Sequence, residues 1–353
     1  MGIVEKFFNT YAKDCEAVVI LNDVNRYYFC GYETSYGILL LTQKKSYFIT
    51  DARYILEAKA NLSDEFEIVE RRGVGAIDFI AQFVKDNSIQ KLGYEGDTLL
   101  YSDYLTLKSI GVKLVSVSLE LANMRSVKSD VELNYIRTAV QIAEKAFTTS
   151  LKKIKAGVTE RDIAIELEYQ AKLLGAESAS FDTIVAFGER TACPHSHPTN
   201  LKLEKNTPIL IDFGVKYNHY CSDMTRVISL GEPSVKIKAL HSAVLNAQKY
   251  ALSEMRAGLT GREVDSFARE YLTARGLGDN FTHSLGHGVG LEIHEAPTLS
   301  QLNNDELIEN MVVTCEPGAY LEGIGGVRIE DTLIIKNDGI ELLNTISKEI
   351  IIL

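Results

Sequence analysis

The sequence predicts a duplicated α+β domain preceded by a smaller α/β unit. The first observation is an internal repeat: AGVTERDI at 156–163 returns as AGLTGREV at 257–264, each time after one long amphipathic stretch and before a second. The second is that each copy leads to two apolar runs with an acidic residue on each arm. Two helix-helix-hairpin halves, offset by about a hundred residues, imply a pseudo-twofold axis. Before the repeat, short strand candidates alternate with helical segments.

The composition argues against several classes of protein. At 353 residues, with 46% hydrophobic and 24% charged residues, the chain is long enough for two domains with separate cores. A formal net charge of −11, with scattered Lys and Arg, argues against a nucleic-acid partner. The longest apolar runs, at 17–21 and 37–41, are too short to span a membrane. The first residues, MGIVEKFFNTYAKD, lack the apolar core of a signal peptide, so we expect a cytoplasmic protein.

Residues 1–125 are expected to form the α/β front domain. The strand candidates are the runs at 17–21, 37–42, 47–50, 91–94 and 112–117, and 77–86 has the spacing of an amphipathic helix. The segment TDARY at 50–54 contains an Asp-Arg pair of the kind that holds the start of a helix. No cluster of catalytic residue types is evident in this domain.

Residues 126–353 are expected to form the duplicated domain. A capping box of Ser129 and Glu132 opens a long helix, whose apolar residues recur at spacings of three and four as far as Ile154. In each copy of the repeat, a glycine is expected to end one helix and a threonine to cap the next. These residues are Gly157 with Thr159 and Gly258 with Thr260.

The two halves carry four acidic residues at corresponding points. In the first half, the runs 208–213 and 224–230 form a predicted antiparallel hairpin that brings Asp212 and Asp223 together. In the second half, 311–335 has the same plan and carries Glu316 and Glu330. Carboxylates gathered on a buried face repel one another unless a proton or a cation lies between them. Because uncompensated buried charge is costly, the acids predict one shared cation site.

The segment THSLGHGVGLEIHE, at 282–295, adds His283, His287 and His294. Four carboxylates and an imidazole suit a pair of hard divalent cations such as manganese better than a zinc-thiolate site. Two such ions can deprotonate a water and polarise a carbonyl, as metal-assisted hydrolysis requires. The five cysteines are an odd number without paired spacing, as expected for reduced thiols. Cys221 and Cys315 lie beside candidate carboxylates, but burial as small hydrophobic residues is the simpler expectation.

The motifs DFG and SDMTR, HSLGHGVGLEIHE, CEPG and VRIED, in this order, resemble the pita-bread metallopeptidases, in particular the Xaa-Pro peptidase branch of aminopeptidase P and prolidase. The resemblance covers nearly the whole chain, including a creatinase-type N-terminal domain over 1–125 and the catalytic domain over 126–353. It implies a duplicated pita-bread fold and a homodimer. It also implies that Asp212 binds one metal, that His287 and Glu316 bind the other, and that Asp223 and Glu330 bridge both.

The same resemblance implies roles for further residues. His195 matches a histidine near the substrate oxyanion, and His283 and His294 match substrate-side and proton-shuttling histidines. Glu316 would also take up the proton of the attacking water, and Arg328 matches an arginine that orients ligands. The implied cofactors are two divalent ions, most simply Mn²⁺, with Co²⁺ or Zn²⁺ as alternatives.

Two departures bear on the substrate. Ser196 and His197 follow His195, where the family usually has glycine, and Ala296 to Thr298 contain no arginine of the kind that holds a dipeptide carboxylate in prolidases. The main expectation is therefore an aminopeptidase that cleaves the N-terminal Xaa-Pro bond of proline-containing peptides. The alternative is an Xaa-Pro dipeptidase. A non-catalytic peptide-binding or scaffold protein of the same fold is the alternative from another class.

Overall fold

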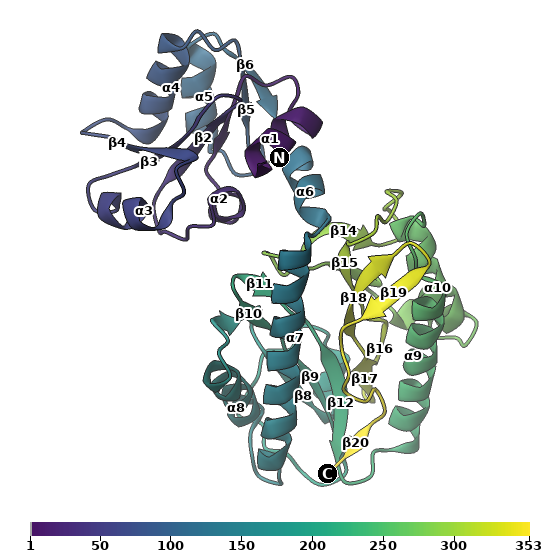
Figure 1. The fold of residues 1–353 in the computed structure, drawn as a ribbon. Helices are drawn as coiled ribbons and strands as arrows, with labels where there is room; N and C mark the ends of the chain where they lie inside the picture. The colour runs from purple at the N-terminus through teal and green to yellow at the C-terminus, as the bar shows by residue number, and fades with distance from the viewer. Residues whose placement is uncertain (1) are drawn as a thin grey trace. The chain divides into compact units, whose positions relative to one another are not determined.

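The computed structural model describes residues 2–353, which fall into two compact units. The front unit ends at Met124, and the C-terminal unit is Arg125–Leu353 (Figure 1). Along residues 2–353, no helix combines the length and the apolar character needed to cross a bilayer.

The front unit is built on a six-stranded sheet with the order β4-β3-β2-β1-β5-β6. Its strands are β1 (Ala17–Ile20), β2 (Ile38–Thr42), β3 (Ser46–Thr50), β4 (Phe66–Glu70), β5 (Lys91–Tyr94) and β6 (Lys113–Ser116). Its helices are α1 (Ile3–Thr10), α2 (Asp23–Cys30), α3 (Ile55–Asn61), α4 (Ala76–Asp86), α5 (Tyr101–Ser109) and α6 (Ser118–Ser126). Since alternate residues of the central strands face opposite ways, the sheet has a core on each face.

The predicted strands of the front unit and its helix over 77–86 are confirmed. Their observed ends differ from the predicted ends by no more than one residue. The pair in TDARY is confirmed as well: the Arg53 guanidinium donates to both carboxylate oxygens of Asp51, at 3.0 and 2.8 Å, just before α3. The α/β interpretation of this unit therefore holds.

The C-terminal unit consists of two halves with the same order of elements. The first contains α7 (Asp130–Ser150), α8 (Glu160–Leu173), β7 (Ser178–Ala179), β8 (Ile184–Phe187), β9 (Thr207–Asp212), β10 (Val215–Tyr217), β11 (Tyr220–Cys221) and β12 (Thr225–Leu230). The second contains α9 (Val235–Glu254), α10 (Gly261–Thr273), β13 (Gly286–Gly288), β14 (Glu295–Leu299), β15 (Val312–Cys315), β16 (Gly318–Leu321), β17 (Gly325–Arg328), β18 (Asp331–Lys336) and β19 (Gly339–Leu342), and β20 (Ile351–Ile352) follows.

Each half is organised around one long hairpin, as predicted. β9 pairs antiparallel with β12 in the sheet β20-β12-β9-β8, and β15 pairs with β18 in the sheet β14-β13-β15-β18-β19. The connection inside each hairpin forms a short hairpin of its own, β10 with β11 and β16 with β17. The helices α7 and α8 pack on the first sheet, and α9 and α10 pack on the second (Figure 1). The duplication inferred from the repeat is thus present in the fold.

The predicted helix starts are confirmed. Ser129, Thr159 and Thr260 are the N-cap residues of α7, α8 and α10, and each forms a capping box with the residue three positions later. These reciprocal bonds satisfy two backbone donors at each helix start, so the sequence signal has a direct structural counterpart.

The predicted helix ends are wrong. The α-helix α7 stops at Ser150 and tightens into a 3₁₀ turn over Leu151–Lys153, and α9 stops at Glu254, so neither reaches its glycine. Gly157 and Gly258 instead lie in turns with φ of +89° and +84°. Each donates its N–H to a carbonyl of a distant segment, at 2.9 Å. Contacts of this kind between segments far apart in sequence are not visible in a local pattern.

Candidate metal centre

The first hairpin brings two acids to one place. Asp212 is the last residue of β9 and pairs in register with Thr225, the first residue of β12. Asp223 lies two residues before Thr225, and the Asp212 and Asp223 side chains are both largely buried. The predicted approach of the two carboxylates therefore follows from the hairpin register.

The second hairpin supplies the other pair. Glu316 directly follows β15, and Glu330 directly precedes β18. The Thr225 hydroxyl of the first hairpin donates to Glu330 Oε2 at 2.7 Å, so the two halves meet at this point. The Thr314 hydroxyl donates to Glu316 Oε1 at 3.3 Å. All four predicted acids thus lie around one centre.

His287, on β13, completes the predicted ligand set. Its Nε2 lies 3.6 Å from Asp223 Oδ2 and 3.3 Å from Glu316 Oε1. Its Nδ1 lies 3.1 Å from the Gly288 carbonyl, which can only accept, so this nitrogen carries the proton and Nε2 keeps its lone pair. Burial lowers the pKa of His287 to about 4, so the imidazole is neutral near pH 7.

The residues present fit divalent metal ions. Ligand atoms of Asp223, His287 and Glu330 all lie within 4.8 Å of one another. Asp212 Oδ1 and Asp223 Oδ1 are buried and have no hydrogen-bond partner in the described part of the chain. Burial and the neighbouring carboxylates raise the pKa of Asp223 and of Glu330 well above the usual range. A buried carboxylate oxygen without a partner is costly, and a cation is the partner that this arrangement lacks.

Arg328, on β17, joins the acids to their surroundings. Its guanidinium donates to Asp212 Oδ2 at 2.6 Å, to the Thr225 hydroxyl at 3.1 Å and to the Tyr320 hydroxyl at 2.8 Å. The Asp212 contact agrees with an orienting role for this arginine. Tyr320, on β16, was not identified from the sequence.

The remaining predicted histidines lie close to these ligands. His283 Nε2 is 2.9 Å from the Tyr320 hydroxyl, and His283 Nδ1 is 4.0 Å from Glu316 Oε2. The His294 ring lies 4.3 Å from the His287 ring, centroid to centroid, at an interplanar angle of 76°. Burial lowers the pKa of His283 to about 4 and also lowers the pKa of His294.

One cavity of about 520 Å³ gathers the whole set. The predicted site residues that line it are His195, Asp212, Asp223, His283, His287, His294, Glu316, Arg328 and Glu330. Sequence reasoning missed the apolar lining of the same cavity, which includes Phe181, Ile184 and Ile293. Ile293 is adjacent to a predicted histidine, whereas Phe181 and Ile184 lie far from any motif. An apolar wall beside a polar centre is typical of a site that binds a small organic ligand.

The residue after His294 is held by a buried charge cluster. Glu295 forms ion pairs with two basic side chains: Arg125 lies 2.6 Å from one carboxylate oxygen, and Lys128 lies 2.7 Å from the other. The two cations come from the segment MRSVK at 124–128, which the sequence marks only as a domain junction. They lower the pKa of Glu295 despite its burial. This cluster fixes the strand start that follows His294.

The two cysteines next to candidate carboxylates, Cys221 and Cys315, are buried thiols. Cys221 and Cys315 have no exposed surface, and burial raises the pKa of both. The Cys221 thiol faces the Leu291 carbonyl at 3.8 Å. Neither residue belongs to the group of potential ligands around Asp223, as expected for small hydrophobic residues.

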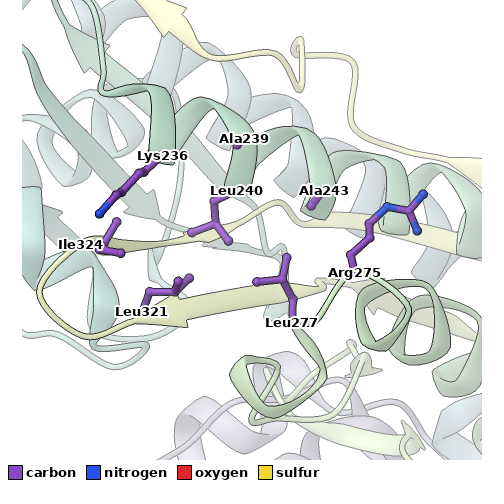
Figure 2. A pocket seen from close by; sticks show the side chains of 8 residues that line it. All are labelled: Lys236, Ala239, Leu240, Ala243, Arg275, Leu277, Leu321 and Ile324. Atoms are coloured by element: carbon purple, nitrogen blue, oxygen red, sulfur yellow. The ribbon is translucent and has the colours of Figure 1, made fainter.

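A second cavity, of about 410 Å³, lies between α9 and the β16–β17 hairpin (Figure 2). Leucine and isoleucine side chains form its floor, and Lys236 and Arg275 lie at its two ends (Figure 2). It contains no acidic residue and no histidine. Of these two cavities, only the larger one is lined by acids and histidines that could bind a metal ion.

The two units of the chain match two family models. Residues 134–337 match metallopeptidase family M24, and residues 10–127 match the creatinase/prolidase N-terminal domain. The chain therefore belongs to metallopeptidase family M24, a family of metal-dependent peptidases. This assignment confirms the predicted class of enzyme, the duplicated pita-bread fold and the involvement of divalent metal ions.

Similar proteins match over nearly the full length. An Xaa-Pro dipeptidase from Pyrococcus furiosus is 38% identical over 342 residues, which cover 95% of each chain. The structure of an Xaa-Pro dipeptidase from Bacillus anthracis is 41% identical, with a TM-score of 0.95 and 99% of each chain covered. The structure of an X-Pro aminopeptidase from Thermotoga maritima is 40% identical, with a TM-score of 0.90, and covers 96% of this chain and 98% of its own.

Proposed function

We propose that this chain hydrolyses Xaa-Pro bonds and that Xaa-Pro dipeptides are its main substrates. The observation that carries the proposal is the set of acids and histidines in one cavity, in a chain whose relatives named Xaa-Pro dipeptidase match over at least 95% of its length. A bond to proline is a tertiary amide without an N–H group, so a peptidase cannot bind that hydrogen. A cavity whose charged groups stabilise the transition state does not depend on that hydrogen.

Two divalent ions are proposed to bind between the two hairpins. Asp212 would bind one ion, His287 and Glu316 the other, and Asp223 and Glu330 both. The predominance of oxygen donors favours Mn²⁺, with Co²⁺ and Zn²⁺ as alternatives. When bound, such ions lower the pKa of a water and polarise the substrate carbonyl.

The side chains around the ions are proposed to handle the protons. Glu316 would accept the proton of the attacking water. His195 and His294 would donate to the developing oxyanion and to the departing proline nitrogen, which a neutral imidazole with one N–H can do. The lowered pKa of His294 supports the neutral form.

Xaa-Pro aminopeptidase activity on longer peptides is the second candidate, and it is the main expectation from the sequence. Ala296, Pro297 and Thr298 supply no arginine for a dipeptide carboxylate, and one relative carries the name X-Pro aminopeptidase. The dipeptidase names of the other two relatives favour the alternative. We therefore place the dipeptide first.

An assay with matched peptides tests the proposal. Metal-loaded protein would be given an Xaa-Pro dipeptide, the corresponding Xaa-Pro-Yaa tripeptide and an Xaa-Ala dipeptide. We expect the highest kcat/KM for the Xaa-Pro dipeptide and loss of turnover after chelation. Faster cleavage of the tripeptide would establish the aminopeptidase alternative. Peptide binding without cleavage of any of them, with metal bound, would favour a binding protein.

A cytoplasmic homodimer is proposed as the form in which the enzyme works. The five cysteines are all free, three of them buried, which suits a reducing compartment. Sedimentation of the purified protein would test the dimer directly.

A further inference from the structure

Glu160, the first residue of α8, is a fully buried carboxylate that is not among the residues lining the larger cavity. Its Oε1 accepts from the Phe187 amide at 2.9 Å and from Arg190 Nε at 3.0 Å. Its Oε2 accepts from the Thr199 amide at 2.8 Å and from the Thr199 hydroxyl at 2.6 Å. A single side chain thus holds both ends of the segment 187–199.

That segment carries His195. Arg190, besides binding Glu160, donates from Nη2 to the His197 carbonyl at 2.9 Å, and the Ser196 hydroxyl donates to the Arg190 carbonyl at 3.1 Å. The two residues that follow His195 are therefore bonded to Arg190, whose guanidinium in turn binds Glu160. The loop has little regular secondary structure of its own apart from the 3₁₀ turn at Gly188–Ala192, so its path depends on these bonds, together with those of Arg328 to the Pro194 carbonyl and of the Gly326 amide to the Thr191 hydroxyl.

The second half contains a comparable arrangement. Asp265, fully buried on α10, accepts from the Leu285 amide at 3.0 Å and from Arg269 at 2.6 and 2.9 Å. Arg269 in turn donates to the carbonyls of Phe281 and His283, at 3.0 and 2.8 Å. Here, too, a buried acid binds an arginine, and this arginine donates hydrogen bonds to the segment that carries a cavity histidine.

The two acids do not occupy equivalent positions, for a steric reason. The repeat aligns Glu160 with Gly261, and a Cβ at Gly261 would lie 2.4 Å from the Thr298 carbonyl oxygen. No side chain fits there, and the acid of the second half stands four residues later on the same helix. Both halves thus contain a buried acid that connects a helix to a histidine-bearing loop, and the two acids stand at non-equivalent positions of the repeat.

We infer that Glu160 and Asp265 are positioning residues, which hold through Arg190 and Arg269 the loops that present His195 and His283 to the substrate. The inference rests on the role proposed for His195 and on the substrate-side role that the family resemblance implies for His283. Neither acid touches the cavity, so each acts through the loop. Their burial and full set of hydrogen-bond donors suit a rigid support.

Glu160→Gln tests the inference, with Glu166→Gln as the matched control. Gln keeps the shape of the side chain but replaces one acceptor oxygen by an NH₂ group, so about half of the bonds to the loop are lost. Glu166 lies on the same helix and, among residues 2–353, its side chain accepts a hydrogen bond only from the Gln170 side chain, at 2.8 Å. We expect faster hydrogen exchange at the amides of Phe187 and Thr199 in Glu160→Gln only, with metal content unchanged in both variants.

Turnover in a double-mutant cycle separates positioning from general stability. Glu160→Gln should lower kcat/KM by about tenfold to a hundredfold, because small displacements of a catalytic group are costly. In the His195→Ala background, the same change should have little further effect. An equal loss in both backgrounds, a loss of metal, or unchanged exchange at Phe187 and Thr199 would overturn the inference.

Two provisions keep the outcome decisive. If Glu160→Gln does not fold, Arg190→Ala, at a partly exposed position, removes the link from Glu160 to the His197 carbonyl, and the same loss of kcat/KM, absent in the His195→Ala background, is expected. If the wild-type protein cleaves no Xaa-Pro peptide, the proposed function fails. The exchange comparison between Glu160→Gln and Glu166→Gln still decides whether Glu160 holds the loop.

Discussion

Individual carboxyl groups in the cavity lack the partners that buried acids normally have. Asp212 Oδ1 and Asp223 Oδ1 are buried without a hydrogen bond among the described residues, while Arg328 neutralises Asp212 only through Oδ2. An unpaired charge of this kind destabilises the protein unless a proton or a metal ion compensates it. These two carboxylate oxygens are therefore available to bind a cation.

Asp223→Asn should remove most of the metal. Because Asp223 is proposed to bind both ions, the substitution should reduce the metal content from two equivalents to one or none. It should also lower kcat/KM by more than about a hundredfold, because removal of a residue that only supports a metal ligand already costs up to about a hundredfold. Elemental analysis and peptide assay measure both effects. Asp338→Asn, at an exposed position beyond β18, should leave both unchanged; full turnover of Asp223→Asn would refute its role.

The metal-free protein should become less stable as the pH rises above neutrality. Burial raises the pKa of Glu316 to about 8, so the folded chain holds a proton that the unfolded chain has released. Stability from such a group is present below the unfolded pKa and is lost as the pH passes the folded pKa. Between about pH 7.5 and 8.5, His283 and His287 do not counteract this, because imidazoles with an ordinary pKa of about 6.5 in the unfolded chain are then largely neutral in both states.

Thermal unfolding of the chelated protein across that range tests this prediction. The midpoint should fall with rising pH, and it should fall less steeply in Glu316→Gln, which has no proton to release. A midpoint that rises with pH in the chelated wild-type protein would contradict the account of the site.

The four acidic candidate ligands could be predicted from the sequence because the repeat places a pair of acids at corresponding positions in each half. Asp212 and Asp223 stand at hairpin ends, and Glu316 and Glu330 stand at the corresponding ends one repeat later. Tyr320 could not be predicted in this way. Its hydroxyl meets Arg328 and His283 only because β16 pairs with β17 beside them, and such proximity depends on tertiary structure.

At the level of elements, close backbone contacts bring His287 to the acids. β13 pairs with β14 on one side and β15 on the other. Gly286 lies so close to β15 that a Cβ there would be 2.1 Å from the Thr314 carbonyl oxygen. The glycines of HSLGHG therefore allow β13 to lie close to its neighbouring strands, and they are not turn residues.

Gly286→Ala should displace β13 and weaken metal binding by about tenfold or more, since ligand geometry depends on such supporting contacts. Gly339→Ala is the matched control, because Gly339 also lies in a strand and has no atom within 4 Å of the added Cβ. Titration with Mn²⁺ measures the affinities. Equal affinity in the Gly286→Ala variant and the wild type would show that β13 tolerates the displacement without moving His287.

Elements with a strong local signal were predictable, and the shortest ones were not. The strands β9 and β12 and the capped helices α7, α8 and α10 have strong local signals in apolar spacing and cap residues. The inner hairpin of β10 and β11 has strands of three and two residues and owes its position partly to pairing with β7. Helix ends likewise depended on contacts of Gly157 and Gly258 with distant segments.

At the level of the whole molecule, the candidate metal ligands are confined to one of the two units. Each unit has its own hydrophobic cores, and every candidate ligand lies in Arg125–Leu353. Arg125 and Lys128 bind Glu295 within that unit, so its structure begins at the junction and not at α7.

A chain of residues 125–353 should therefore fold and bind as much metal as the full-length protein. A chain that begins at Ser129 lacks Arg125 and Lys128 and leaves the buried Glu295 without its cations, so it should be less stable. Unfolding midpoints and elemental analysis of both chains measure these effects. Loss of metal from residues 125–353 would show that the front unit contributes to the centre.

The proposed binding of two divalent ions between the two hairpins can be observed in crystals grown with Mn²⁺ and measured at a wavelength where manganese scatters anomalously. We expect two anomalous peaks within about 4 Å of each other, one next to Asp212, the other next to His287 and Glu316, and both in contact with Asp223 and Glu330. A single peak, or peaks away from these five side chains, would contradict it.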